Sequence, residues 1–160
     1  ALRDIAKVQP GQKVLINGAS GGVGSFAVQI AKSLGAEVTG VCSKTNVDMV
    51  RSIGADEVID YTSEDFTEGG ARFDVILDNV ENRSLSDCRG ALTPTGTLIV
   101  NSGTGARGMA MFIRLIKPLL LVESGKLRLV IDKSYSLYET PAALAYIEGG
   151  HARGKVVVGI

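Results

Sequence analysis

Residues 17–24 constrain the fold of this chain more than any other segment, because they place four glycines between an expected strand and an expected helix. The run Lys13–Ile16 before them is short, apolar and branched, which is typical of a buried strand. From Ser25 to Leu34 the apolar residues recur at helical spacing, and Gly35 ends the segment. Glycines at such a junction let the backbone turn tightly and let free N–H groups face an anion. The pattern is therefore typical of a loop that holds the pyrophosphate of a dinucleotide.

Apolar strands alternate with helices along most of the remaining chain. Further strands are expected at 37–42, 57–60, 73–77 and 97–100, with helices at 47–53 and near 84–92. Strands that are almost wholly apolar are typical of a parallel sheet covered on both faces. The sequence thus predicts an α/β domain with a doubly wound parallel sheet, a Rossmann fold. Beyond it we expect helices at 111–122 and 140–148 and a last strand at 155–158.

The charge balance narrows the classes of function. The 17 basic residues match the 17 acidic residues, so the formal net charge is zero, which argues against binding nucleic acid by bulk charge. The longest apolar stretch is too short and too charged to cross a membrane. Two cysteines, Cys42 and Cys88, form no disulfide framework and lack metal-ligand spacing, and His151 is the only histidine. We expect a reduced, cytoplasmic protein with no metal site.

Two other glycine patterns in the sequence have to be distinguished from this one. Residues 103–108 also fit G-x-G-x-x-G, but no strand–helix–strand unit follows them, so we interpret them as the loop after the fifth strand. Residues 18–24 also fit the short-chain dehydrogenase pattern, a family that needs a Tyr-x-x-x-Lys pair for proton transfer. None of the four tyrosines has a lysine four residues later, which excludes that family.

The end of the second expected strand bears on which dinucleotide binds. NAD-binding sites usually have an acidic residue there, about 20 residues after the loop, to accept hydrogen bonds from the ribose 2′-OH. In this chain the position is Cys42, followed by Ser43 and Lys44. Ser43 can donate to a 2′-phosphate and Lys44 can neutralise it, although a solvated loop lysine is the plain alternative. We expect NADP(H), with NAD(H) less favoured.

Four segments in order carry a family pattern: Gly11-Gln-Lys-Val-Leu-Ile16, Gly18-Ala-Ser-Gly-Gly-Val-Gly24, Gly54-Ala-Asp-Glu-Val-Ile-Asp-Tyr61 and Gly150-His-Ala-Arg-Gly-Lys-Val-Val157. Together they resemble the medium-chain dehydrogenase/reductase superfamily, within it the zinc-independent quinone oxidoreductases of the zeta-crystallin-like branch. The resemblance implies an NADPH-dependent oxidoreductase that transfers a hydride to a small-molecule substrate, a quinone or an activated alkene or carbonyl. A non-catalytic NAD(P)-binding module on the same fold is the alternative.

The resemblance also implies a set of cofactor-binding residues in three groups. The pyrophosphate group is Ser20, Gly21, Gly22, Val23 and Gly24, the 2′-phosphate group is Ser43, Lys44 and Tyr61, and the nicotinamide group is Asn79, Val80, Ser102 and Gly103. Tyr61 as a core aromatic and Asn79 as a strand-end cap are the plain alternatives. No residue stands out as an acid or base, so the catalytic residues stay unassigned.

Domain organisation follows from the same resemblance. Members of the family carry an N-terminal GroES-like domain, and Ala1 matches a point just after it. We interpret residues 1–130 as the dinucleotide-binding domain and 131–160 as a tail that returns toward that further domain, which makes His151 and Lys155 poor catalytic candidates. The apolar segment 109–121 and an unpaired strand at 156–158 predict a homodimer.

Overall fold

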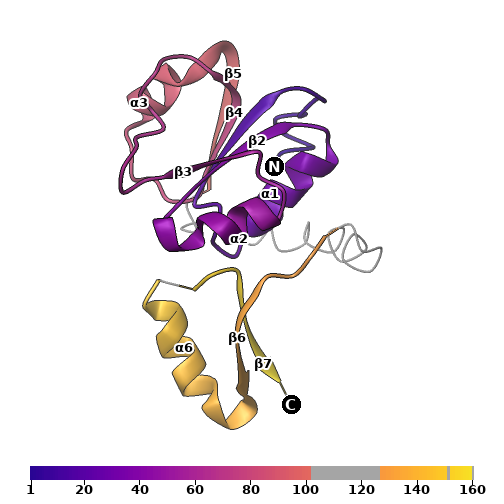
Figure 1. The fold of residues 1–160 in the computed structure, drawn as a ribbon, viewed down its shortest axis with the longest axis vertical. Coiled ribbons are helices and arrows are strands. Elements are labelled where there is room, and N and C mark those ends of the chain that lie inside the picture. The colour runs from indigo at the N-terminus through magenta and orange to yellow at the C-terminus, as the bar shows by residue number, and fades with distance from the viewer. Residues whose placement is uncertain (102–126, 151, 160) are drawn as a thin grey trace.

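A five-stranded parallel sheet organises the first two thirds of the chain, in a computed structural model that describes residues 1–101, 127–150 and 152–159. The strands lie in the order β3-β2-β1-β4-β5 (Figure 1). Their bounds are Lys13–Asn17 for β1, Glu37–Cys42 for β2, Glu57–Asp60 for β3, Phe73–Asp78 for β4 and Leu92–Val100 for β5. The strand order reverses between β1 and β4, which is the switch point of a doubly wound sheet. The predicted Rossmann fold is confirmed.

Helices cover both faces of the sheet, so the central strand is buried on both sides. Helix α1 spans Gly24–Ser33, α2 spans Val47–Ser52 after the short 3-10 helix η1 at Lys44–Asn46, and α3 spans Leu85–Gly90. Val14 and Ile16 of β1 pack in one core cluster with Val28 of α1, whereas Leu15 packs in the other with Cys88 of α3. Alternate residues of β1 thus pack into two separate cores, which explains the unbroken apolar run of this strand.

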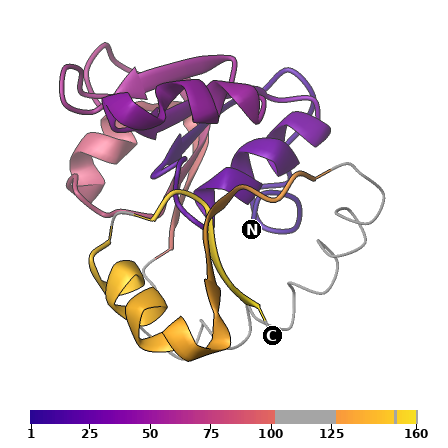
Figure 2. The same cartoon turned by 60° about the horizontal axis from the view of Figure 1, so that its bottom comes forward.

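The end of the chain forms a smaller unit of its own. Strands β6 (Ile131–Ser136) and β7 (Lys155–Gly159) make a two-stranded parallel sheet. A parallel pair needs a crossover, which is supplied by η2 (Leu137–Glu139) and α6 (Thr140–Glu148). Figures 1 and 2 show this unit below the larger domain, and its two strands form a sheet separate from the five-stranded one.

One expectation for this region changes. The strand predicted to be unpaired has β6 as its partner: Ile131 lies opposite Lys155 and Ser136 opposite Gly159, with a shift of register between Ile131 and Lys133. Strand β6 is not evident in the sequence, because Asp132, Lys133 and Ser134 interrupt any apolar run and the strand is largely solvent-accessible. The helix expected at 111–122 lies outside the described residues. Among those that are described, no helix is long and apolar enough to cross a membrane.

Two sets of hydrogen bonds attach the smaller unit to the larger domain. The Gln29 side chain of α1 donates to the carbonyl of Arg128 at 2.9 Å and accepts from its N–H at 2.6 Å. The N–H of Gly154 donates to the carbonyl of Ser20 at 2.8 Å. The second bond places the start of β7 directly against the glycine loop.

Candidate functional site

The loop between β1 and α1 brings backbone segments closer together than side chains would allow. Gly18 has φ +76°, in the left-handed region, and a Cβ on it would lie 2.8 Å from Cγ2 of Val80. A Cβ on Gly24 would overlap the carbonyl oxygen of Gly18 and lie 2.8 Å from Cα of Ala19. Only glycine fits at both positions, so α1 can begin directly against the end of β1.

The start of α1 has no side-chain cap. Val23, at the N-cap, makes no side-chain capping bond, and no acidic residue stands in the first turn. An uncapped helix start presents N–H groups and the positive end of the helix dipole. The helix start and the tight glycine loop together have the geometry that a dinucleotide pyrophosphate requires. The residues present therefore fit such a group.

The end of β2 lies beside the end of β3. Cys42 is in register with Asp60, and the N–H of Tyr61 donates to the Cys42 carbonyl at 3.1 Å, so Tyr61 lies next to the stretch that begins at Ser43. Burial, and secondarily the charge of Asp60, raises the pKa of the Cys42 thiol to about 11. The thiol is therefore neutral at physiological pH and does not repel a phosphate. Lys44 is exposed and Tyr61 is 51% exposed, which excludes Tyr61 as a core aromatic.

Asn46 links two of the predicted groups and was not anticipated. Its Nδ2 donates to Oγ of Ser20 at 3.3 Å and to Oγ of Ser43 at 3.0 Å. Its Oδ1 is buried and has no hydrogen-bond partner in the described structure. Asn46 thus joins the pyrophosphate group to the 2′-phosphate group through one amide, two residues beyond Lys44.

A carboxylate borders the predicted 2′-phosphate group. Asp60 accepts from the N–H and the hydroxyl of Thr62 at 3.0 and 2.8 Å. These hydrogen bonds, followed by the charge of Lys44, lower the pKa of Asp60. Lys44 therefore has an anionic neighbour, which reduces the positive potential at the end of β2.

Asp78 at the end of β4 holds the next turn in place. It is 2% exposed, and its Oδ1 accepts from Nδ2 of Asn17 at 2.8 Å, from the N–H of Val80 at 3.0 Å and from the N–H of Glu81 at 2.9 Å. Glu81 has φ +58°, a left-handed conformation that this carboxylate helps to hold. Nothing in the local sequence distinguishes Asp78, because it follows directly on an apolar run.

Asn79 joins three strand ends. Its Nδ2 donates to the carbonyl of Asn17 at 2.9 Å, and its Oδ1 accepts from Nδ2 of Asn101 at 3.0 Å. This is the strand-end cap that sequence analysis gave as the plain alternative for Asn79. Val80 beside it stays exposed and lies against Gly18. The two remaining residues of the nicotinamide group, Ser102 and Gly103, lie outside the described residues.

Lys155 lies closer to the glycine loop than sequence analysis placed it. Its Nζ would lie 3.2 Å from a Cβ on Gly22 and is 4.9 Å from the centre of the Phe26 ring in the first turn of α1. Burial lowers the pKa of the ammonium. Nothing in the sequence around Lys155 indicates this contact, since it depends on how the end of the chain folds back.

The predicted groups therefore converge on one edge of the sheet, at the carboxyl ends of β1, β2 and β4. In open α/β sheets, ligands bind at this edge near the switch point. No group of three or more His, Cys, Asp or Glu residues is placed to hold a metal ion within the described part of the chain.

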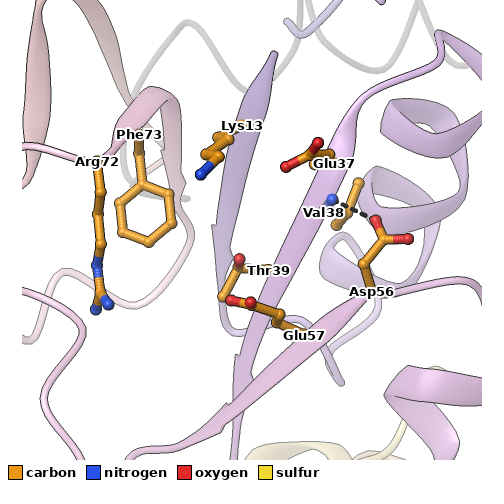
Figure 3. A pocket seen from close by; sticks show the side chains of 8 residues that line it. All are labelled: Lys13, Glu37, Val38, Thr39, Asp56, Glu57, Arg72 and Phe73. Carbon is orange, nitrogen blue, oxygen red and sulfur yellow. Dashed lines mark hydrogen bonds between the residues drawn. The ribbon is translucent and has the colours of Figure 1, made fainter. Parts of the chain in front are cut away.

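A cavity of about 320 Å³ lies at the opposite edge of the same sheet (Figure 3). Its lining includes the first residues of four strands: Lys13, Glu37, Glu57 and Phe73. Since the glycine loop follows the last residue of β1, this cavity is separate from the predicted dinucleotide site.

Comparison with known proteins finds relatives of this chain among dehydrogenases and oxidoreductases. A family described as zinc-binding dehydrogenase matches residues 22–125, and a second family of the same description matches residues 114–158. The mitochondrial NAD(P)H oxidoreductase RTN4IP1 of Mus musculus is 37% identical over 94% of this chain and 48% of that protein. The chloroplastic quinone-oxidoreductase QR1 of Triphysaria versicolor is 32% identical over 97% of this chain and 54% of that protein.

Solved structures show the same fold. An NAD-dependent alcohol dehydrogenase superposes with a TM-score of 0.81 at 25% identity, over 99% of this chain and 54% of that one. The quinone oxidoreductase from Coxiella burnetii gives 0.68 at 24% identity, over 99% and 56%. The chain spans about half the length of the curated relatives it matches.

The expectation of a cytoplasmic protein is wrong. The similar oxidoreductases from Mus musculus, Bos taurus, Homo sapiens and Danio rerio are named mitochondrial, and two plant relatives are named for the chloroplast. Balanced charge and unpaired cysteines describe the chemistry of a domain and not the compartment in which it works.

Replacing Asp78 tests whether its carboxylate organises the turn after β4. Asp78→Ala leaves three donors without their acceptor, so we expect the free energy of unfolding to fall by about 2–3 kcal/mol in urea titrations. Asp78→Asn keeps the Oδ1 acceptor and should lose clearly less. Equal stability of Asp78→Ala and the unsubstituted chain would contradict this role.

Proposed function

This chain belongs to the zinc-binding dehydrogenase family of the medium-chain dehydrogenase/reductase superfamily, and we propose that it is the coenzyme-binding part of an NADPH-dependent oxidoreductase. The substrate we propose is a small molecule, a quinone or an activated alkene or carbonyl, with no role for nucleic acid. The observation that carries the proposal is the glycine loop, where Gly24 meets the backbone of Gly18 at the switch point of the sheet. Relatives named NAD(P)H oxidoreductase and quinone oxidoreductase support it.

The residues of this chain bind and orient the coenzyme. A reduced nicotinamide, when bound, supplies hydride transfer from its C4 atom. The backbone from Ser20 to Gly24 would hold the pyrophosphate at the start of α1, and Ser43, Lys44 and Tyr61 would surround the adenosine 2′-phosphate. Holding the pyrophosphate and the 2′-phosphate in this way would fix the position of the nicotinamide ring. A reacting group held in place has a lower activation barrier.

The nicotinamide half would lie along the carboxyl ends of β4 and β5. Val80 is exposed beside Gly18, and Asn79 holds the strand ends together, so we propose that they border this half with Ser102 and Gly103. We also propose the division into a binding domain at 1–130 and a tail at 131–160. No residue is proposed as a catalytic acid or base.

Binding of the coenzyme is tested by thermal unfolding. NADPH should raise the melting temperature, because a ligand that binds only the folded state stabilises it by about 2.7 kcal/mol at a hundredfold excess over Kd. Gly22→Leu should abolish this shift, because its side chain would press on the Gly154 carbonyl and on Lys155 Nζ, each 3.2 Å from a Cβ at this position, and would keep a phosphate away from the loop. Gly90→Leu is the matched control, since a side chain there meets nothing within 4 Å. Absence of a shift with millimolar NADPH or NADH in the unsubstituted chain would refute the proposal.

Preference for NADP(H) is tested at Lys44. Lys44→Ala should weaken NADPH by about tenfold and leave NADH unchanged, because a charge-assisted contact contributes roughly 1.5 kcal/mol or more and only NADPH carries the 2′-phosphate. Asp60→Asn should strengthen the binding of NADPH, since it removes the carboxylate beside Lys44. Titration calorimetry that gives equal affinities for both coenzymes in the unsubstituted chain would rule the preference out.

A non-catalytic NAD(P)-binding module is the second candidate, because the described residues include no proposed acid or base. Measuring the oxidation of NADPH by the protein with a panel of quinones distinguishes the oxidoreductase from the non-catalytic module. Coenzyme binding without turnover supports the module, and turnover supports the oxidoreductase.

We also propose that the chain forms a homodimer. Leu144 and Ile147 of α6 and Ile131 of β6 are 56%, 50% and 52% exposed, which is apolar surface of the kind that interfaces use. The apolar segment 109–121, which also supported this expectation, lies outside the described residues. Light scattering should give the mass of a dimer, and a monodisperse monomer at tens of micromolar would exclude it.

A further inference from the structure

The cavity at the edge of the sheet opposite the glycine loop is lined by two residues whose polar groups lack protein partners. Thr39 of β2 is 7% exposed, and its hydroxyl makes no hydrogen bond within the described residues. Figure 3 shows this hydroxyl turned toward the space between Lys13 and Glu37. Nε of Arg72 is buried and has no partner there either. A buried polar group is costly unless it is hydrogen-bonded, so these two groups point to a ligand in the cavity.

Both groups belong to side chains that the fold holds in place. Nη2 of Arg72 donates to the carbonyl of Phe66 at 3.3 Å, and the guanidinium lies 5.1 Å from the centre of the Phe73 ring. Thr39 lies inside the sheet, in register with Glu57 of β3. Donors in fixed positions lose little entropy when a ligand binds to them.

The charged residues of the lining are divided by sign across the sheet. Glu57 lies on β3 and Glu37 on β2. Lys13 lies on β1, and Arg72 directly precedes β4. Since the strand order is β3-β2-β1-β4, the acidic groups occupy one side of the cavity and the basic groups the other (Figure 3). None of these four residues forms an ion pair with another residue of the described ranges.

Asp56 also lines the cavity, but its charge is already compensated. Its carboxylate accepts from Nζ of Lys32 at 2.8 Å and from the N–H of Val38 at 2.7 Å. The unpaired charges of the lining are therefore those of the two glutamates and the two basic residues, which balance. A ligand of no net charge, with its positive and negative groups apart, complements such a lining better than an anion or a cation does.

The size of the cavity limits the ligand further. Its volume of about 320 Å³ is near the lower end of small-molecule sites, which run from roughly 300 to 1,000 Å³. Val38 and Phe73 supply the apolar part of the lining. A single small molecule with an apolar part fits these conditions, and a dinucleotide does not.

We propose that this cavity binds a free α-amino acid with an apolar side chain. Its carboxylate would meet Lys13 and Arg72, with the Thr39 hydroxyl as a further donor, and its ammonium would meet Glu37 and Glu57. The site is separate from the glycine loop, so this inference does not rest on the proposed function.

The experiment titrates the unsubstituted chain with L-leucine and with two analogues that each lack one charged group. Isocaproate is leucine without its ammonium, and isoamylamine is leucine without its carboxylate. Leucine should bind in titration calorimetry, and each analogue should bind at least about tenfold more weakly, because each leaves two charges of the cavity without a partner.

Thr39→Val tests the hydroxyl with little change of shape. The affinity for leucine should fall about tenfold, as expected for the loss of a hydrogen bond to a charged group. The melting temperature without leucine should stay the same or rise, because the variant no longer buries an unpartnered hydroxyl. Thr97→Val is the matched control: it changes a threonine of β5, in the same sheet but outside the cavity lining, and should leave the affinity unchanged.

Glu57→Gln tests the ammonium side of the cavity at an exposed position, where folding does not depend on the substitution. It should also weaken leucine about tenfold, and it gives the test should Thr39→Val fail to fold.

Three results would overturn the inference. Absence of leucine binding at millimolar concentrations would remove the site, and isocaproate that binds as well as leucine would make it a site for simple carboxylates. An unchanged affinity in both Thr39→Val and Glu57→Gln would place leucine elsewhere on the molecule. Titration with NADPH tests the proposed function separately, and Thr39→Val should bind NADPH as the unsubstituted chain does.

Discussion

The approach of Gly24 to the backbone of Gly18 and Ala19 determines where everything else at the site can lie. A Cβ on Gly24 would overlap the Gly18 carbonyl, so the absence of a side chain lets α1 start at the end of β1. The helix then covers one face of the sheet with its apolar side, while its uncapped start faces the edge where the strands end. Packing of the core and the position of the proposed anion site are consequences of the same contact.

Backbone hydrogen bonds hold the glycine loop on three sides. Ala19 donates to Val41 at the end of β2, and Asn79 after β4 donates to Asn17 at the end of β1. Gly154 donates to Ser20 from the start of β7. Side chains of Asn46 and Asp78 reinforce the first two connections. A loop held in this way would bind the proposed coenzyme with little rearrangement, because the entropy of ordering it is already lost on folding.

Local patterns in the sequence predict all five strands of the sheet, although β5 begins at Leu92 and not at residue 97 as expected. The strands at 37–42 and 57–60 appear in the structure with the predicted bounds, because their apolar residues are buried between two helical layers. Strand β6 could not be predicted, since its polar residues serve a small, exposed sheet. The glycine loop could be predicted from its spacing. The contacts of Asn46, Asp78 and Lys155 depend on partners far along the chain, which no local pattern encodes.

The hydrogen bonds between Gln29 and Arg128 have a consequence for the order in which the chain folds. They join residues 99 positions apart, so a long stretch of chain must be closed before they can form. Loop closure of this length is entropically costly, and contacts of high sequence separation form slowly. The β1–α1–β2 unit, by contrast, is assembled from neighbouring segments. We therefore expect the C-terminal strands to dock late, onto a glycine loop that the first βαβ unit has already shaped.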